Sequence, residues 1–466
     1  LESLLRRLSA EQVPVRVHDI IIKGNTKTKD FLIESMVEEL FRGATSFQQL
    51  LQAAGIANMR LQGLEIFDLV NITLDAGPPE LPGTANVVID VSELKSPLSA
   101  DFGMYTKPQA RSWAIESSVK MKNLFGHGDI WDGLVGYGGS QTLEISTGVS
   151  VPRFRSISNP LSGRIFLLSQ DWLKFSSFKE RALGLSCSIF TSQNHELSYN
   201  LSWRTLTDPS QMASFAVRSQ LGHGLFSGLK YGFKVDRRDQ PLRPTSGYAF
   251  ASTTNIYGLF PDIRSFKLFR QEFDLRYAIP LGFLKAALNL GVSAGVVCPW
   301  GNGSSGKPSY LPERFFMDGN ASPVCSLKGP TSVYGFKSRG LGPAQPRRRR
   351  LAGDDDENSS GMDRLGGDLA VTAFADLSFD LPLKFLRDAG IHGHLFASTG
   401  SLTPLTENSY REIASLQGFR ESFRSSAGFG LVVPTKLFRM EANYCYILKQ
   451  QEHDCGKTGI QFSFSA

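Results

Sequence analysis

The sequence lacks any run of about 18 uncharged apolar residues, the length that a helix needs to cross a membrane. Its most apolar window, residues 281–297, is interrupted by Lys285 and Asn289. We therefore expect no transmembrane helix. The sequence also begins with Leu1 instead of methionine and shows no basic, apolar and small-residue signal peptide. We interpret this beginning as a chain whose native N-terminus lies upstream.

Cysteine and catalytic motifs are also scarce. The five cysteines have neither CxxC spacing nor the even number of a disulfide framework, so they indicate neither zinc nor disulfides and leave the redox compartment open. The sequence has no G-x-S-x-G elbow and no P-loop. His392 and His394 form the one close histidine pair, with no carboxylate beside them in the sequence, which favours a surface or lumen pair over a metal site. We expect no enzyme activity, no cofactor and no metal.

The sequence also has little net charge for its length. The formal net charge is +6 over 466 residues, and the four arginines of residues 347–350 account for much of it. An acidic run, residues 354–357, follows closely, which favours a self-neutralising loop over a nucleic-acid patch. We therefore expect no nucleic-acid partner.

What the sequence has in abundance is alternation of apolar and polar residues. From Phe273 to Ile279 every second residue is apolar, and after the break at residues 280–282 the alternation resumes. A period of two predicts strands with one apolar and one polar face. The same pattern recurs in residues 143–151, 197–203, 369–379, 440–446 and 460–464.

Two architectures use such strands. In a soluble β-sandwich or propeller the apolar faces meet in a core, whereas in a transmembrane barrel they meet lipid and the polar faces line a lumen. Segments of about ten residues, with Gly, Ser, Asn and charged residues on their polar faces, favour the barrel. The predicted fold class is an all-β transmembrane barrel of about 16 antiparallel strands, preceded by a small α+β domain.

The small domain is predicted for residues 1–95. A strand is followed by two helical stretches, the first closed by Gly43 and the second opened by Thr45, with Gln48 as its capping-box partner. Two more strands are expected around residues 70–74 and 86–91. This βααββ order resembles a polypeptide-transport-associated (POTRA) domain, and the residues that carry the resemblance are Val17, Ile20, Gly24, Asn25 and Thr28.

Three motifs in residues 96–466 resemble one family, the outer-membrane protein-assembly barrels. The first is similar to its NLFGxG element, the second to its D-x-R-D … G signature, and the third to its E-R-F and V-R-G-F elements. The residues of the first motif are Asn123, Gly126 and Gly128. Those of the second are Asp236, Arg238, Asp239 and Gly247. Those of the third are Arg314 and Phe315 with Val333, Tyr334, Gly335 and Phe336.

The resemblance implies that a loop around residues 318–364 folds back into the lumen and that its tip, residues 333–336, braces the wall. Tyr334 departs from the family pattern, which has arginine there. Arginine pairs with carboxylates as a fork, whereas tyrosine offers one hydroxyl and a ring. The brace is therefore expected to be altered or to use another cation, and Lys337 and Arg339 are nearest in sequence.

The resemblance also implies a function. Members of this family insert β-barrel precursors into outer membranes, and one POTRA domain before sixteen strands is similar to their mitochondrial branch, with the POTRA domain facing the intermembrane space. The implied partners are unfolded barrel precursors, accessory subunits of the assembly complex and outer-membrane lipid. A chloroplast-envelope assembly or import pore, and a passive porin, are the alternatives.

A lateral seam is expected where the first and last barrel strands meet. Gly103 weakens the packing of the first strand, and the last strand is short, so a seam of few hydrogen bonds opens at low cost. Its open edges would let a client strand pair. The predicted seam residues are Asp101, Gly103 and Tyr105 on one side and Ile460, Phe462 and Phe464 on the other.

Overall fold

A computed structural model describes residues 14–107, 112–138, 142–153, 159–192, 194–259, 267–283, 285–301, 308–319, 321–325, 327–348, 361–405, 416–434 and 439–465. The chain divides into two compact units. The first unit comprises Leu1–Phe102, Ser117–Leu134 and Ser146–Arg164, and the second comprises Gly103–Glu116, Val135–Ile145 and Ile165–Ala466.

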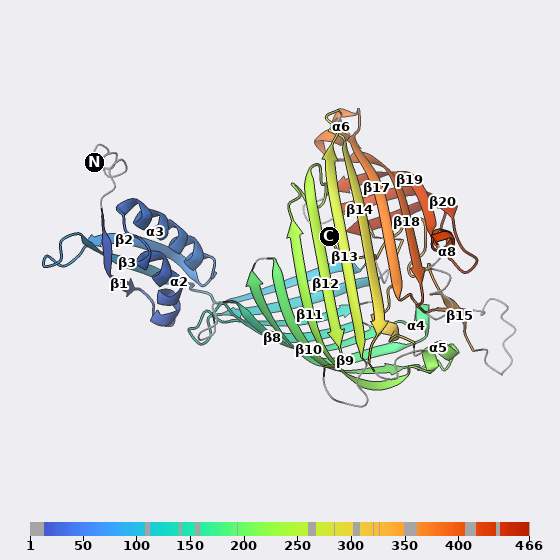
Figure 1. Cartoon of the computed structure of the whole chain (residues 1–466), viewed down its shortest axis with the longest axis horizontal. Coiled ribbons are helices and arrows are strands. Elements are labelled where there is room, and N and C mark those ends of the chain that lie inside the picture. The colour runs from blue at the N-terminus through green and yellow to red at the C-terminus, as the bar shows by residue number, and fades with distance from the viewer. Residues whose placement is uncertain are drawn as a thin grey trace. The chain divides into compact units, whose positions relative to one another are not determined.

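The first unit begins with the expected βααββ order. Its elements are β1 (Arg16–Lys23), α2 (Asp30–Arg42), α3 (Phe47–Gln62), β2 (Phe67–Ala76) and β3 (Thr84–Glu93). The strands form a sheet of order β1-β3-β2, with β1 parallel and β2 antiparallel to β3. Both helices cover one face of this sheet (Figure 1), and their apolar sides bury Phe41, Leu50 and Leu61 against Ile89.

The start of the second helix differs from the prediction. Helix α3 begins at Phe47, and its N-cap is Ser46, whose side chain accepts a hydrogen bond from the Gln49 amide. Thr45 lies one residue earlier and donates its own amide to Gln49 Oε1 at 2.9 Å. The predicted capping box is therefore wrong by one residue, because both Thr45 and Ser46 carry a hydroxyl that fits an N-cap.

Sixteen further strands form one antiparallel sheet, as predicted, in which each strand pairs with the next strand of the sheet along the chain (Figure 1), while β15 and β16 pair only with each other. The strands are β4 (Leu98–Lys107), β5 (Ser112–Lys122), β6 (Ile130–Gly138), β7 (Thr142–Val151), β8 (Leu161–Asp171), β9 (Lys179–Ser192), β10 (His195–Thr207), β11 (Gly222–Asp236), β12 (Gly247–Tyr257), β13 (Leu268–Pro280), β14 (Ala287–Pro299), β17 (Leu369–Asp380), β18 (His392–Thr403), β19 (Arg424–Pro434), β20 (Arg439–Lys449) and β21 (Gly459–Ser465).

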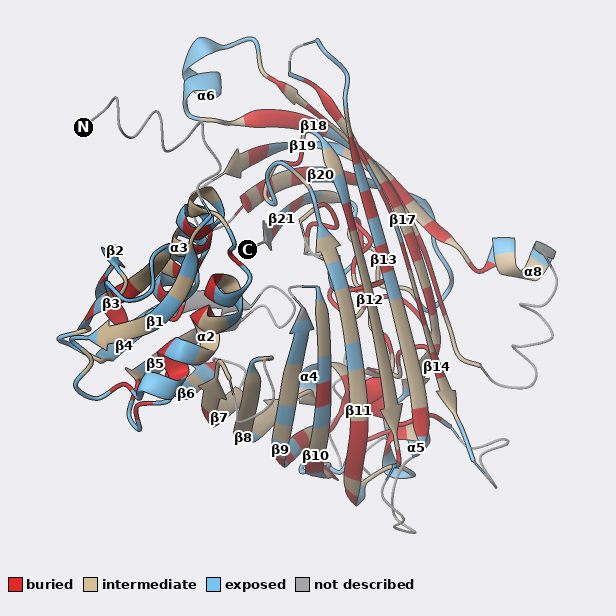
Figure 2. Ribbon diagram, turned by 60° about the vertical axis from the view of Figure 1, so that its left-hand side comes forward, coloured by how far each residue is buried: buried red, intermediate tan, exposed pale blue. Residues whose placement is uncertain are grey.

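The two faces of this sheet decide between the soluble and the membrane architecture. In β13, Phe273 and Tyr277 are 47% and 52% exposed, whereas Asp274 and Arg276 are 1% and 5% exposed. Figure 2 shows buried residues alternating with exposed or intermediate ones along β14 and the second half of β13. Large apolar side chains therefore point outward and charged ones inward, the reverse of a soluble sandwich and the pattern of a barrel wall in lipid.

The long connection between β14 and β17 packs against the inward face. Phe315, Val333 and Phe336 of this connection share an apolar cluster with Val297 of β14 and Leu402 of β18. Short elements lie in this and other connections: α4 (Leu173–Ser176), α5 (Phe215–Arg218), η2 (Leu311–Glu313), β15 (Ala344–Pro346), β16 (Met362–Arg364), α6 (Lys384–Asp388) and α8 (Leu416–Glu421).

The sheet has two edges, β4 and β21, so the predicted closure of the barrel is not observed in the part of the chain that the structure describes. Strand β21 has only seven residues. A short final strand offers few hydrogen bonds with which to close a sheet. Among the described helices, none is long and apolar enough to cross a membrane.

Candidate functional site

The tip of the β14–β17 connection, residues 333–336, is fully buried against the inner face of the last strands. Val333, Tyr334 and Phe336 are at most 1% exposed. The Tyr334 amide donates to Ser398 Oγ of β18 at 3.2 Å, and its carbonyl accepts from Ser426 Oγ of β19 at 2.6 Å. The tip is therefore tied to two neighbouring strands through its backbone.

The side chain of Tyr334 extends these contacts to β20. Its hydroxyl donates to Glu441 Oε2 at 2.8 Å and lies 3.0 Å from Ser322 Oγ. Its ring centroid lies 4.4 Å from that of Phe396. The hydroxyl and the ring are each used, as the sequence predicted for a tyrosine in place of arginine.

The cation at this site comes from the barrel wall and not from the loop. Arg439 of β20 donates from Nε to Glu441 Oε1 at 2.7 Å and from Nη1 to the Leu242 carbonyl at 2.8 Å. Arg339, one of the two cations suggested by sequence proximity, instead lies over the Trp172 ring, 3.6 Å from its centroid. Lys337, the other, is exposed. Neither of these two takes the place of the missing arginine.

The tip also reaches the last strand. The Gly335 amide donates to Gln461 Oε1 of β21 at 3.3 Å, and the Gly335 carbonyl accepts from the Lys457 amide at 2.8 Å. Gly335 has φ of +89°, a left-handed conformation that favours glycine. A side chain at this position would be strained, so glycine lets the tip present its amide to β21.

The E-R-F element holds the beginning of the connection. Glu313 accepts from Arg204 at 2.7 Å and from Arg270 at 3.2 Å, on strands β10 and β13. Burial by itself would raise the pKa of Glu313, but the two guanidinium groups outweigh it and lower that pKa. Arg314 donates to Ser309 Oγ at 2.7 Å, and Phe315 lies beneath Arg270 at 4.7 Å. Phe315 thus contacts the wall at β13, whereas Arg314 holds the connection to itself at Ser309.

The D-x-R-D motif stabilises the turn between β11 and β12. Arg238 pairs with Asp236 at 2.8 Å, and Asp239 accepts from the Thr245 amide at 2.9 Å. Gly247 has φ of +102°, and a Cβ there would lie 2.2 Å from the Arg237 carbonyl oxygen. Both carboxylates therefore hold this turn together.

The N-L-F-G-H-G turn packs, within the first unit, against the loop that follows β1. Asn123 donates to Thr28 Oγ1 at 2.8 Å and accepts from the Gly128 amide at 3.0 Å. The Gly126 carbonyl accepts from the Lys29 amide at 2.9 Å. Gly126 has φ of +80°, and a Cβ there would lie 2.2 Å from the Lys27 carbonyl oxygen, so only glycine fits this approach.

The predicted seam residues lie on the two edge strands of the sheet. Asp101 and Gly103 of β4 are exposed, as are Ile460 and Phe462 of β21 at 64% and 59%. Between them on β21, Gln461 and Ser463 are buried. Tyr105 and Phe464 belong to the same strands, but their side chains lie outside the described residues.

The histidine pair has a partner that sequence spacing does not reveal. His394 Nδ1 lies 2.5 Å from Asp376 Oδ2 on the neighbouring strand β17, and its Nε2 lies 2.7 Å from Asn443 Oδ1. Sequence spacing could not show this carboxylate, because Asp376 lies on the neighbouring strand and 18 positions away in the chain. Within the described ranges, no group of three metal-ligating side chains could hold an ion.

Sequence reasoning missed the wall residues that receive the loop tip. Arg439, Glu441 and Asn443 occupy alternate positions of β20, and Gln461 lies on β21. The available signal was the polar half of the same period-two pattern. Charged residues at every second position of a membrane strand mark its lumenal face, where a partner must neutralise them.

Comparison with known proteins gives consistent results. The chain is 27% identical over 465 residues to the Sorting and assembly machinery component 50 homolog of Mus musculus, and the match covers 97% of this chain and 90% of that protein. The Homo sapiens homolog is 26% identical with the same coverage.

The fold also matches a solved structure. The crystal structure of BamA from Haemophilus ducreyi lacking POTRA domains 1–3 aligns with a TM-score of 0.74 at 16% identity, over 97% of this chain and 84% of that one. The family model described as the Omp85 superfamily domain matches residues 123–466, well over half of the chain. The chain therefore belongs to the Omp85 superfamily.

Proposed function

We propose that this protein assembles β-barrel precursors and inserts them into the mitochondrial outer membrane. The similarity to Sorting and assembly machinery component 50 homologs over 97% of the chain carries this proposal. The outward apolar face of the sixteen-stranded sheet supports a position within a membrane. The apolar cluster between the β14–β17 connection and the wall argues against a passive porin, because it fills space that a solute pore leaves open.

The proposed mechanism is strand templating at the edges of the sheet. A precursor strand cannot enter lipid with unpaired backbone groups, since each such group costs several kcal/mol there. Strands β4 and β21, as sheet edges, offer N–H and C=O groups to which a precursor strand can pair before it meets hydrocarbon. Completed hydrogen bonds and burial of apolar faces supply the free energy, so no covalent chemistry is required.

In this proposal the buried tip sets the position of β21. Tyr334 and Gly335 contact strands β18 to β21, and Gln461 is the contact on the edge strand itself. A fixed β21 would present its backbone to the precursor in one register. The brace and the templating edge are then parts of one site.

The N-terminal α+β region would act as a POTRA domain, residues 1–95, facing the intermembrane space. Its sheet has β1 and β2 as edges, and an extended precursor segment can pair with such an edge. Accessory subunits of the assembly complex and outer-membrane lipid complete the set of proposed partners.

Two measurements test the proposal. Mitochondria depleted of this protein should import a radiolabelled porin precursor but fail to assemble it, and the wild-type chain should restore assembly. The protein itself should stay in the membrane pellet after extraction with alkaline carbonate. Normal porin assembly after depletion, or release of the protein into the supernatant, would contradict the proposal.

A further inference from the structure

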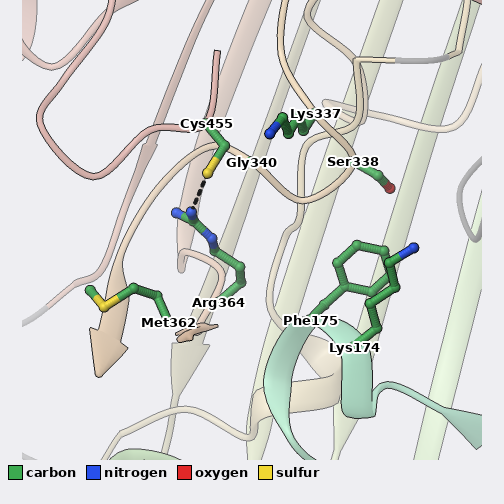
Figure 3. A pocket seen from close by; sticks show the side chains of 8 residues that line it. All are labelled: Lys174, Phe175, Lys337, Ser338, Gly340, Met362, Arg364 and Cys455. Carbon is green, nitrogen blue, oxygen red and sulfur yellow. Dashed lines mark hydrogen bonds between the residues drawn. The ribbon is translucent and has the colours of Figure 1, made fainter. Parts of the chain in front are cut away.

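A cavity of about 190 Å³ lies where several connections of the sheet meet. Helix α4 joins β8 to β9, strand β16 lies between β14 and β17, and Cys455 lies between β20 and β21. In an antiparallel sheet these three connections fall at the same end, opposite the end at which β4 begins. The cavity is lined by Lys174, Phe175, Lys337, Ser338, Gly340, Met362, Arg364 and Cys455 (Figure 3).

The frame of the cavity is held by hydrogen bonds between its three walls. Ser176 of α4 donates to the Arg364 carbonyl at 2.7 Å. The Lys337 amide donates to the Cys455 carbonyl at 2.9 Å, and the Cys455 amide donates to the Gly340 carbonyl at 2.7 Å. These three contacts hold the walls of the cavity without using the charged ends of its side chains.

The charge inside this frame is of one sign. Three of the lining residues, Lys174, Lys337 and Arg364, are cations, and no lining residue is a carboxylate. Arg364 donates from Nη1 to the His453 carbonyl at 2.6 Å and from Nη2 to Cys455 Sγ at 2.7 Å (Figure 3 shows the contact with sulfur). Further N–H groups of the fork remain for another acceptor.

The carboxylates nearest in sequence are already engaged. Asp363 accepts from Arg347 at 2.8 Å, and Asp454 accepts from Arg424 at 2.9 Å. In the part of the chain that the structure describes, none of the three cavity cations forms an ion pair with a carboxylate. Among the described residues the three cations line one cavity without a carboxylate partner, so the cavity attracts an anion.

We propose that this cavity binds a small anion of phosphate type, with Arg364 as the fixed donor and Lys174 and Lys337 as the mobile cations. Its volume is below the roughly 300 Å³ at which pockets for drug-sized ligands begin. At about 30 Å³ for each water, the cavity has the volume of about six waters, which admits a phosphate group with several waters beside it. Phe175 and Met362 lower the local polarity, which strengthens each charge–charge attraction. The inference is independent of the proposed assembly function.

The first test measures stabilisation by the anion. The full chain, purified in detergent and phosphate-free buffer, is heated with increasing inorganic phosphate or with chloride at equal ionic strength. Phosphate, but not chloride, should raise the unfolding temperature of the wild-type protein. The double variant Lys174→Gln/Lys337→Gln should bind phosphate at least about tenfold more weakly, since each lost charge-assisted contact costs about that factor.

A matched control removes a charge elsewhere. Lys384 is exposed on α6, which joins β17 to β18 at the opposite end of the sheet. Lys384→Gln should respond to phosphate as the wild type does. Both cavity lysines are exposed, and their side chains make none of the hydrogen bonds that hold the walls, although Lys174 Nζ lies 5.8 Å from the Phe175 ring centroid. The double variant is therefore expected to fold.

A second readout places the anion in the cavity. Phosphate should slow iodoacetamide labelling of Cys455 in the wild type, measured by peptide mass spectrometry, and should not slow it in the double variant. A parallel series with short-chain phosphatidic acid against phosphatidylcholine distinguishes a lipid phosphate from a free one. A response to phosphatidic acid alone identifies a lipid headgroup as the source. No response to either phosphate, or an equal response in the double variant, overturns the proposal.

Discussion

At the scale of single residues, the cation that neutralises Glu441 comes from the barrel wall and not from the loop motif. Tyr334 stands where the family pattern has arginine, and its hydroxyl meets Glu441, which Arg439 already pairs at 2.7 Å. The arginine of β20 thus neutralises the carboxylate, and the loop contributes only a neutral hydrogen-bond donor. The hydroxyl contact is still a bond to a buried charge, which is stronger than a bond between neutral groups.

Replacing Tyr334 by phenylalanine should therefore destabilise the barrel. The Tyr334→Phe variant keeps the ring packing on Phe396 but leaves Glu441 without one donor, which lowers the free energy of unfolding by about 1–3 kcal/mol. Urea unfolding of the purified protein in detergent, followed by tryptophan fluorescence, measures the change. The control is Tyr444→Phe, at an outward position of β20, the strand that carries Glu441, and it should leave the stability unchanged. Equal midpoints for Tyr334→Phe and the wild type would show that the contact contributes nothing.

Glu93 gives a second prediction at this scale. Burial by itself would raise its pKa, but hydrogen bonds from Thr26, Thr28 and Lys27 outweigh it and lower the pKa of Glu93 to about 2. A carboxylate with a depressed pKa stabilises the folded state above its ordinary pKa of 4.5, and this contribution is lost as the pH falls from there to about 2. The wild type should lose stability over that window, whereas Glu93→Gln should start less stable and lose less. Parallel stability curves for the two proteins would contradict the assignment.

At the scale of elements, the β14–β17 connection contacts strands that lie far apart in the sheet. Its E-R-F element contacts β10 and β13, and its tip contacts β18, β19, β20 and β21. Hydrogen bonds between neighbouring strands hold each strand only to the next one, whereas this connection holds distant parts of the sheet in one arrangement. We expect it to stabilise the curvature of the sheet as well as its final strand.

Deleting Gly335 and Phe336 should test this role. The deletion removes the Gln461 contact and the fully buried Phe336 side chain, so the barrel should unfold at a lower temperature and assemble precursors poorly. The N-terminal α+β region has its own apolar core and should stay folded, which limited proteolysis can measure. Wild-type heat stability together with normal precursor assembly in the deletion variant would rule out a bracing role.

At the scale of the whole molecule, the sheet is long enough for a barrel but ends in two unpaired edges. Sixteen strands satisfy one another's backbone groups except at β4 and β21. Unpaired edges are a liability in a soluble protein, because they pair with other chains. In a protein that we propose to fold other barrels, the same edges are the working surface.

A disulfide that joins β4 to β21 should block the insertion of precursors at these edges. Paired cysteines, one placed among residues 101–105 and one among residues 459–464, are introduced into a variant that lacks Cys445 and Cys455. Under oxidising conditions a disulfide should form and reduce precursor insertion to near background, and a reductant should restore it. Single-cysteine variants control for the substitutions. Insertion at the unlocked rate by the locked protein would mean that precursors do not use this seam.

The sequence by itself determined the features that depend on neighbours along the chain. Alternation in residues 273–279 predicted outward apolar and inward polar side chains, and the structure confirms both. The βααββ order and the sixteen strands also followed from local periodicity and from resemblance. Such features are readable because a strand or a helix repeats its environment every two or 3.6 residues. The N-cap of α3 is Ser46 instead of the predicted Thr45, so the local pattern located the start of this helix only to within one residue.

Only the tertiary structure decided which polar residues meet. Tyr334 and Glu441 are 107 positions apart, Arg204 and Glu313 are 109 apart, and Asp376 faces His394 from another strand. The cavity beside Arg364 likewise draws its cations from two separate connections. Lumenal charges can pair with any strand that the curved sheet brings opposite them. Their partners are therefore set by the register of the strands and the path of the β14–β17 connection, which no local pattern specifies.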